Sequence, residues 1–118
     1  PTITSMINRT ALIVRAKEPF LQWLKSLPDP PEHESTLDSV NIESLVYLVP
    51  EIADDGDEDK VIELAYKTIF ENELEGWWTD PSDWPEIKNR EQFNEWFEVT
   101  LHSCIEDLVD DPIIDEEF

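Results

Sequence analysis

The sequence predicts an α+β fold, in which a small sheet of residues 9–16 and 44–49 is packed by helices over residues 18–27, 58–75 and 90–109. Two short runs of β-branched and apolar residues predict the strands, and three longer runs with apolar residues at helical spacing predict the helices. Such a switch of pattern along one chain is typical of the α+β class. The chain of 118 residues has the size of a single domain.

The first strand is predicted around Thr10–Arg15, because the residues on both of its alternating faces are apolar. Glu18-Pro19 then opens a helix, since proline is tolerated in a first helical turn. This helix ends before the proline-rich loop that begins at Pro28. Its apolar face consists of Phe20, Leu21, Trp23, Leu24 and Leu27.

The second strand is predicted from Ser44 to Val49, after a short turn through Val40 that Ser35 or Thr36 caps. Because one helix and about 25 residues separate the strands, a right-handed parallel βαβ crossover is the expected connection. A sheet of two strands is marginally stable by itself. Either a third strand comes from one end of the chain, or helices or a partner subunit cover the sheet.

The helix over residues 58–75 begins after Asp57, the expected N-cap, and ends at Gly76. Its apolar positions, Leu64 among them, cover more than half of its circumference, so we expect it to be largely buried. The last helix begins after Asn89, whose cap Gln92 reciprocates. Its predicted inner face holds Phe93, Trp96, Phe97, Leu101, Cys104, Ile105 and Leu108.

The predicted domain covers residues 6–111, with Met6 near its start. Residues 1–5 are expected to form a disordered extension. Residues 112–118 form an acidic tail, which is loosely held unless Ile113 and Ile114 dock.

The charge of the chain is strongly negative and unevenly distributed. The net charge is −21; residues 1–50 carry 4 bases and 6 acids, and residues 51–118 carry 4 bases and 23 acids. Such a field disfavours nucleic acids and anionic membranes and attracts a basic protein, a cationic ligand or a divalent metal. The other interpretation is that the charge only keeps the chain soluble. We expect a cytoplasmic protein, because no signal peptide or long apolar run is found.

Metal and catalytic sites are not predicted. The acidic loop Asp54–Asp59 fails the EF-hand spacing, since Ala53 and Ile62 would fall at ligand positions. Glu98, His102 and Glu106 would recur every four residues on the solvent-exposed face of the predicted last helix, where pairing of side chains four residues apart explains them. His33 is an equally weak candidate for a metal ligand. No nucleophile or phosphate-binding motif is present, and the single Cys104 excludes an internal disulfide. We therefore expect a protein that is not an enzyme and has no cofactor.

The strongest candidate for a binding site is the connection Gly76–Pro85, which holds three of the five tryptophans. Asp80, as an N-cap, and Pro81 predict a short helical turn. In one interpretation the tryptophans only attach this turn to the core; in the other, exposed rings beside carboxylates bind a cation or a partner protein. The candidate residues are Trp77, Trp78, Trp84, Asp80, Asp83, Glu73 and Glu75.

The segments Asn8–Lys17, Pro19–Leu24 and Gly76–Pro85 resemble a family of small, acidic, uncharacterised bacterial proteins, with weaker similarity at Val46–Glu51 and Phe93–Phe97. The resemblance covers about residues 8–111. It implies a bacterial cytoplasmic protein, and it implies no activity, cofactor or site residue.

Two functions are compatible with the sequence. The first is a non-enzymatic acidic interaction protein, such as an inhibitor, an immunity-type protein or a regulatory factor, that binds a basic partner. The alternative is a small-ligand-binding domain, with an aromatic and carboxylate pocket around Trp77–Trp84 for a cationic ligand or a metal. The two strands are apolar on both faces, so association into a homodimer is also left open.

Overall fold

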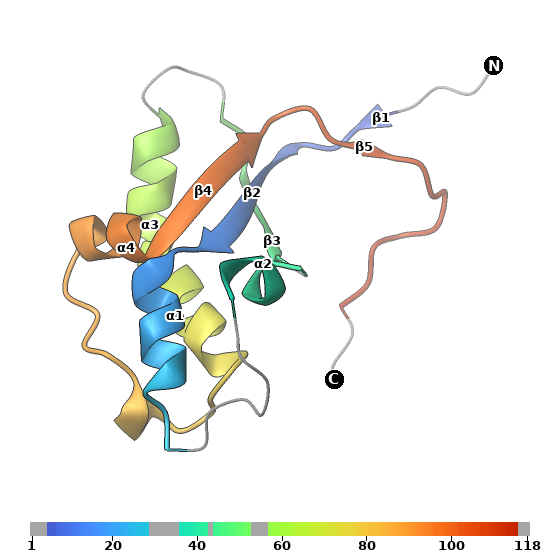
Figure 1. The fold of residues 1–118 in the computed structure, drawn as a ribbon. Helices are drawn as coiled ribbons and strands as arrows, with labels where there is room; N and C mark the ends of the chain where they lie inside the picture. The colour runs from blue at the N-terminus through green and yellow to red at the C-terminus, as the bar shows by residue number, and fades with distance from the viewer. Residues whose placement is uncertain (1–4, 29–35, 43, 53–56, 116–118) are drawn as a thin grey trace.

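The computed structural model describes residues 5–28, 36–42, 44–52 and 57–115. Its main sheet has three strands in the order β3-β2-β4, and a two-stranded ribbon, β1-β5, extends from one end of it (Figure 1). The α+β class is therefore confirmed. The strands are β1 Ser5–Met6, β2 Arg9–Ala16, β3 Val46–Pro50, β4 Phe97–His102 and β5 Glu106–Asp107.

The helices pack against one face of the sheet, and the predicted helix starts at Glu18 and after Asn89 are confirmed. Thr36 caps the short α2 through the backbone N–H of Ser39. The helices are α1 Glu18–Lys25, α2 Leu37–Val40, α3 Asp57–Glu75 and α4 Arg90–Trp96, with a 3-10 turn, η1, at Pro81–Asp83. Within the described ranges, none of these helices could cross a lipid bilayer.

The predicted parallel crossover is wrong, because β2 pairs antiparallel with β3 and with β4. A parallel arrangement requires the connecting helix to run back along the sheet. Instead, α1 continues beyond the end of β2 (Figure 1). The chain therefore re-enters the sheet at the end it left, and β3 runs opposite to β2.

The predicted helix over residues 90–109 is also wrong beyond Trp96, where the chain becomes strand β4. Phe97 to His102 alternate between inward and exposed positions and pair with β2 along its length. Phe93, Phe97 and Leu101 are spaced four residues apart, so they fit a helix, but Phe97, Val99 and Leu101 fit a strand equally well. Beyond β4, Cys104 and Leu108 are exposed, contrary to the prediction of an inner helix face.

The core lies between the sheet and the helices α1, α3 and α4. Leu12 and Val14 of β2 meet an aromatic cluster in which Phe70 of α3 is fully buried. The centroid of the Phe70 ring lies 5.1 Å from that of Phe97 and 5.3 Å from that of Trp96. The other rings of the cluster are Phe20, Trp23, Tyr66 and Phe93.

Helix α3 is buried along one side only. Leu64 is 87% exposed, so its predicted burial is wrong. The buried residues recur at the spacing of a single helical face, because the sheet and α4 cover only that side. They are Ile62, Tyr66, Ile69, Phe70 and Leu74.

The side chain of Asn41 takes the place of a strand partner at the end of β2. Its Oδ1 accepts from the backbone N–H of Ala16 at 2.8 Å, and its Nδ2 donates to the Ala16 carbonyl at 3.1 Å. The segment after α2 is thereby fixed to the sheet just before β3 begins.

Replacing Asn41 with alanine is expected to lower the free energy of unfolding by about 1–3 kcal/mol, because two partly buried backbone groups lose their partner. Urea denaturation measures this change. Asn94→Ala is the matched control, since among the residues that the structure describes the exposed Asn94 amide accepts only from Arg90. Equal denaturation midpoints for the two variants would show that the two hydrogen bonds of the Asn41 side chain contribute nothing to stability.

The opposite face of the sheet is open within the part of the chain that the structure describes. Alternation along the strands places Ala11, Ile13 and Arg15 of β2 on this face. Val46 and Leu48 of β3 and Thr100 of β4 lie beside them in register. Val46, Leu48, Arg15 and Thr100 are exposed. We call this surface the open sheet face.

Candidate functional site

The tryptophan connection is built around η1, whose predicted start at Asp80 and Pro81 is confirmed. The Asp80 carboxylate accepts from the backbone N–H and the hydroxyl of Ser82, at 3.0 and 2.8 Å. These hydrogen bonds lower the pKa of Asp80. The charged carboxylate of Asp80 therefore already accepts the hydrogen bonds that stabilise the η1 turn.

Three indole N–H groups find acceptors at this turn. Trp78 donates to the Asp83 carboxylate at 2.9 Å, and Trp23 of α1 donates to the Asp83 carbonyl at 3.0 Å. Trp84 donates to the carbonyl of Trp78 at 2.7 Å. Trp78 and Trp84 are partly buried and pack against the hydrophobic core. These contacts match the interpretation in which tryptophans attach the turn to the core.

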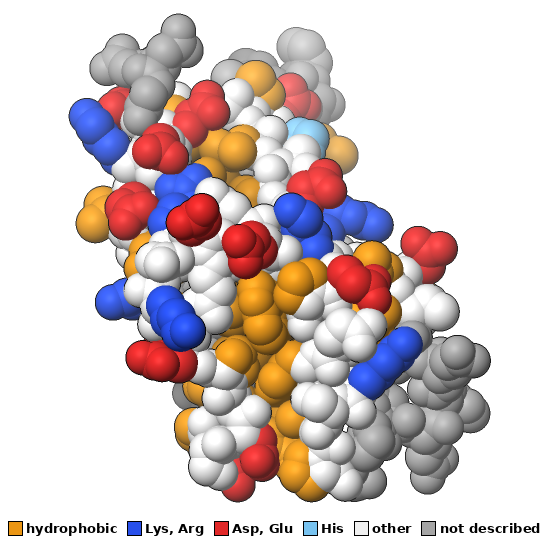
Figure 2. All heavy atoms as spheres, turned by 60° about the vertical axis from the view of Figure 1, so that its left-hand side comes forward, with side chains coloured by type: hydrophobic (Ala, Val, Ile, Leu, Met, Phe, Trp, Pro, Cys, Tyr) orange, Lys and Arg blue, Asp and Glu red, His pale blue; other side chains and the backbone are white. Residues whose placement is uncertain are grey.

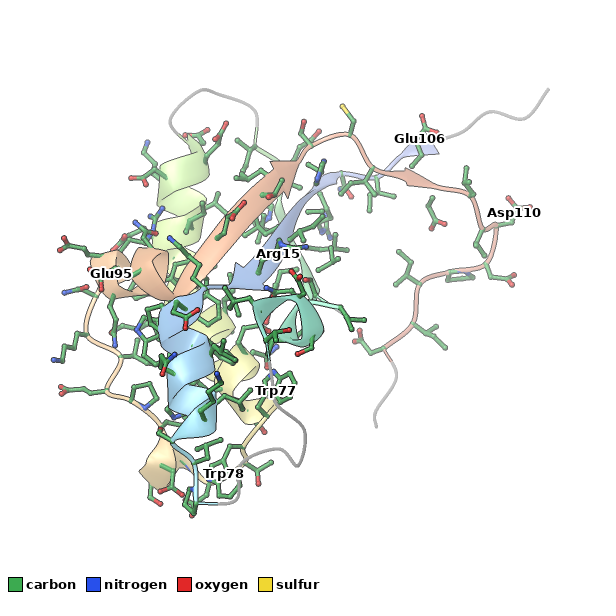
Figure 3. The ribbon with its side chains drawn as sticks, in the orientation of Figure 1. Arg15, Trp77, Trp78, Glu95, Glu106 and Asp110 are labelled. Atoms are coloured by element: carbon green, nitrogen blue, oxygen red, sulfur yellow. The ribbon has the colours of Figure 1, made fainter. Side chains whose placement is uncertain are left out.

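Trp77 lies apart from this arrangement. Its side chain is 44% exposed. Trp77 and Trp78 are adjacent in sequence, yet their labels lie at different levels of the fold in Figure 3. Trp77 lines a pocket of about 440 Å³, whereas Trp78 and Trp84 do not.

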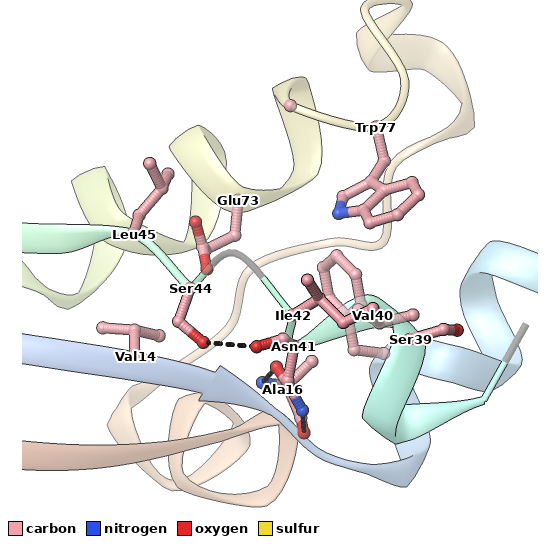
Figure 4. Close-up of a pocket in the computed structure, with 12 residues that line it drawn as sticks. Val14, Ala16, Ser39, Val40, Asn41, Ile42, Ser44, Leu45, Glu73 and Trp77 are labelled. Atoms are coloured by element: carbon pink, nitrogen blue, oxygen red, sulfur yellow. Dashed lines mark hydrogen bonds between the residues drawn. The ribbon is translucent and has the colours of Figure 1, made fainter.

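The pocket lies between the end of α3, the segment from α2 to β3, and the last residues of β2 (Figure 4). Val14, Ala16 and Phe20 contribute apolar surface from the core side. Val40, Ile42 and Leu45 contribute more from the α2–β3 segment. A mostly apolar pocket of this size is typical of small-ligand and side-chain binding sites.

Glu73 is the one carboxylate among the described residues that line the pocket. Its Oε2 accepts a hydrogen bond from the Tyr47 hydroxyl at 3.0 Å, and Asn72 Nδ2 lies 3.4 Å from that hydroxyl. Partial burial raises the pKa of Glu73, and the Tyr47 hydrogen bond offsets part of the rise. Burial is also the main reason that the pKa of Tyr47 is raised.

The surroundings of the pocket are negative. Residues 68–87 hold six acids and no base. Three of the acids, Glu71, Glu73 and Glu75, lie at the C-terminal end of α3, and that end of the helix contains no base. The helix dipole makes this end negative, so acids here oppose the stability of the helix. Both the dipole and the side chains favour a cation near the pocket.

Only two of the seven predicted residues line the pocket, namely Glu73 and Trp77. Four others lie at the η1 turn, namely Trp78, Asp80, Asp83 and Trp84. Glu75 is exposed outside the pocket. Sequence reasoning did not identify Asn41, Ile42 or Leu45 as site residues, because their proximity to Glu73 and Trp77 depends on tertiary contacts. Tyr47 was identified only as a strand residue.

Among the described residues, no group of three or more His, Cys, Asp and Glu side chains gathers where it could hold a metal ion. Glu98 and His102 lie on strand β4, so their predicted helical repeat with Glu106 does not exist. His33 and residues 53–56 of the acidic loop lie outside the described residues.

The fold and the pocket together define a small α+β protein with helices on one sheet face and an apolar, carboxylate-bearing pocket at the sheet end. No protein-family model matches the chain, and searches of curated proteins and of solved structures return no match. The resemblance to a bacterial family therefore stays a prediction.

Proposed function

We propose that this chain is a non-enzymatic acidic interaction protein that binds a basic partner through residues 68–87 and the adjacent pocket. The observation that supports this most is the run of six acids without a base, at a helix end that disfavours acids. A sequence that accepts such a cost in stability gains a site for positive charge.

The distribution of ion pairs also supports residues 68–87 and the adjacent pocket as the binding region. In the described part of the chain, the ion pairs involve only the bases Lys60 and Arg90, with Asp57, Asp59 and Glu63. All of these acids lie in the first half of α3. Basic side chains also lie among acids on the face in Figure 2. The carboxylates at the C-terminal end of α3 have no such compensation among the described residues, so a basic partner would meet them directly.

The affinity for a short Arg- and Lys-rich peptide tests this proposal. Raising the ionic strength from about 0.01 M to about 0.15 M shortens the Debye length from about 30 Å to about 8 Å, so we expect at least tenfold weaker binding. The net charge of the whole chain would by itself make the binding salt-dependent. A pair of matched variants therefore separates this general effect from binding at residues 68–87.

Neutralising Glu71, Glu75 and Glu86 to glutamine is expected to weaken peptide binding about tenfold, because each exposed charge contributes up to about 1 kcal/mol. The control neutralises Glu58, Glu91 and Glu95, which are equally exposed and lie elsewhere. Both triple variants have the same net charge. Fluorescence anisotropy gives the two affinities, and equal weakening in both variants would reject residues 68–87 as the binding region.

A second candidate is supported by the pocket itself, namely binding of a small organic cation between Trp77 and Glu73. The pocket combines an exposed indole face, a partly buried carboxylate and apolar walls. An alkylammonium or alkylguanidinium group suits all three, through cation–π attraction, ion pairing and burial of its alkyl chain. The same interactions would hold an Arg or Lys side chain of a basic partner protein. Binding of the small cation by itself distinguishes a small-ligand site from a site for a partner's side chain.

A further inference from the structure

The C-terminal arm, residues 103–115, projects from the body of the protein. It touches the rest of the described chain through the β1-β5 ribbon, in which Ser5 pairs with Asp107 and Met6 with Glu106. Figure 3 places Glu106 and Asp110 far from the helices. The radius of gyration is 16.4 Å, whereas a compact domain of this length has roughly 13–14 Å.

The arm combines exposed apolar side chains with acids. Leu108, Val109, Ile113 and Ile114 are between 64% and 79% exposed. The arm also holds five acids and no base. A two-stranded ribbon is marginally stable in water without a covering surface. Apolar residues in such a segment therefore indicate that another surface covers them.

The open sheet face has the complementary character. Val46 is 57% and Leu48 49% exposed, and Ile13 lies opposite Val46 in the strand register. Arg9 and Arg15 of β2 alternate onto the same face. In the described residues, neither arginine has an ion pair, although Glu98 lies opposite Arg15 in the strand register. The face thus offers apolar contact and positive charge together.

We propose that two copies of this chain form a reciprocal dimer, in which the arm of each copy covers the open sheet face of the other. Both complementary surfaces belong to one chain, so a two-fold arrangement uses each of them once and closes the assembly. Acidic side chains of the arm would pair with Arg9 and Arg15, and its apolar residues would cover Val46 and Leu48. This dimer is independent of the proposed function, because the pocket lies on the other face of the sheet.

The mass in solution is the first test. At tens of micromolar, sedimentation equilibrium should give twice the chain mass of 13.8 kDa. A mass of one chain would overturn the proposal, including the case in which an arm folds onto its own sheet. Leu64→Ser, which removes an exposed apolar side chain outside both surfaces, should leave the dimer unchanged.

A charge exchange then tests the surfaces. Variant one carries Arg9→Glu and Arg15→Glu, and variant two carries Asp110→Lys, Asp111→Lys and Asp115→Lys. Each alone places like charges at both contacts, so its dimer dissociation constant should rise at least about tenfold. Mixed together, the two variants present opposite charges at both contacts and should form a heterodimer. Homodimers that persist, or a mixture that stays monomeric while circular dichroism shows folded chains, would overturn the assignment.

Discussion

Replacing Phe70 with alanine is expected to lower the free energy of unfolding by about 3–5 kcal/mol. Phe70 is fully buried, and its ring lies within 6.3 Å of the rings of Phe93, Trp96 and Phe97, measured between centroids. Alanine would leave a cavity that aromatic neighbours on three sides cannot easily fill. The loss is a large fraction of the ~5–15 kcal/mol that stabilises a typical domain.

Urea denaturation of Phe70→Ala measures this loss, with Leu64→Ala on the same helix as the control. Leu64 is 87% exposed, so its truncation should change the free energy of unfolding by no more than about 0.5 kcal/mol. The comparison tests the core that α3 shares with α4 and β4, because the rings of Trp96 and Phe97 pack on Phe70. A small effect for Phe70→Ala would contradict this core.

Glu73→Gln is expected to weaken the binding of n-butylguanidinium about 10- to 100-fold. A hydrogen bond to a charged group contributes about 1.5–3 kcal/mol, and the amide keeps the shape but not the charge. Glutamine still offers Tyr47 an acceptor, so the fold should be preserved. Glu75→Gln is the matched control, because it removes the same charge two residues away from an exposed position.

The same binding should depend on pH through Glu73. Burial raises the pKa of this carboxyl above its usual range. Only the ionised form pairs with the cation, so affinity should be full above this pKa and should fall as the pH drops through it. The guanidinium of the ligand stays charged throughout, so the change reports the protein. Isothermal titration calorimetry at several pH values checks this, and Glu73→Gln should remove the dependence. An unchanged profile in that variant would mean that another group binds the cation.

The local elements of the fold were predictable because their patterns are unambiguous. β2 occupies the predicted residues 9–16, and α3 begins and ends within one residue of the prediction. Proline at α1 and asparagine before α4 marked their helix starts correctly. Gln92 was expected to return to Asn89, but its side chain accepts from the backbone N–H of Lys88 instead.

The topology was not predictable in the same way. Phe93, Phe97 and Leu101 satisfy a helix and a strand alike, and pairing with β2 decides between them. The direction of β3 depends on where α1 points after Ala16, which no local pattern encodes. Both errors therefore come from tertiary contacts that override local periodicity.

The candidate site was predicted in part. The pattern of aromatic residues among acids indicated residues 73–84 as a candidate site, and Glu73 and Trp77 of that set line the pocket. Sequence reasoning could not separate Trp77 from Trp78 and Trp84, because the separation depends on hydrogen bonds to Asp83 and to the Trp78 carbonyl. The remaining walls come from the α2–β3 segment, which Asn41 fixes to the sheet.

Hydrogen exchange with and without the Arg- and Lys-rich peptide tests most directly whether residues 68–87 and the pocket form the binding surface. Our expectation is that backbone amides in residues 39–45 and 68–87 exchange more slowly in the presence of the peptide. Amides of β4 and of the first half of α3 should be unaffected. Protection confined to those other segments, or spread evenly over the acidic surface, would contradict it.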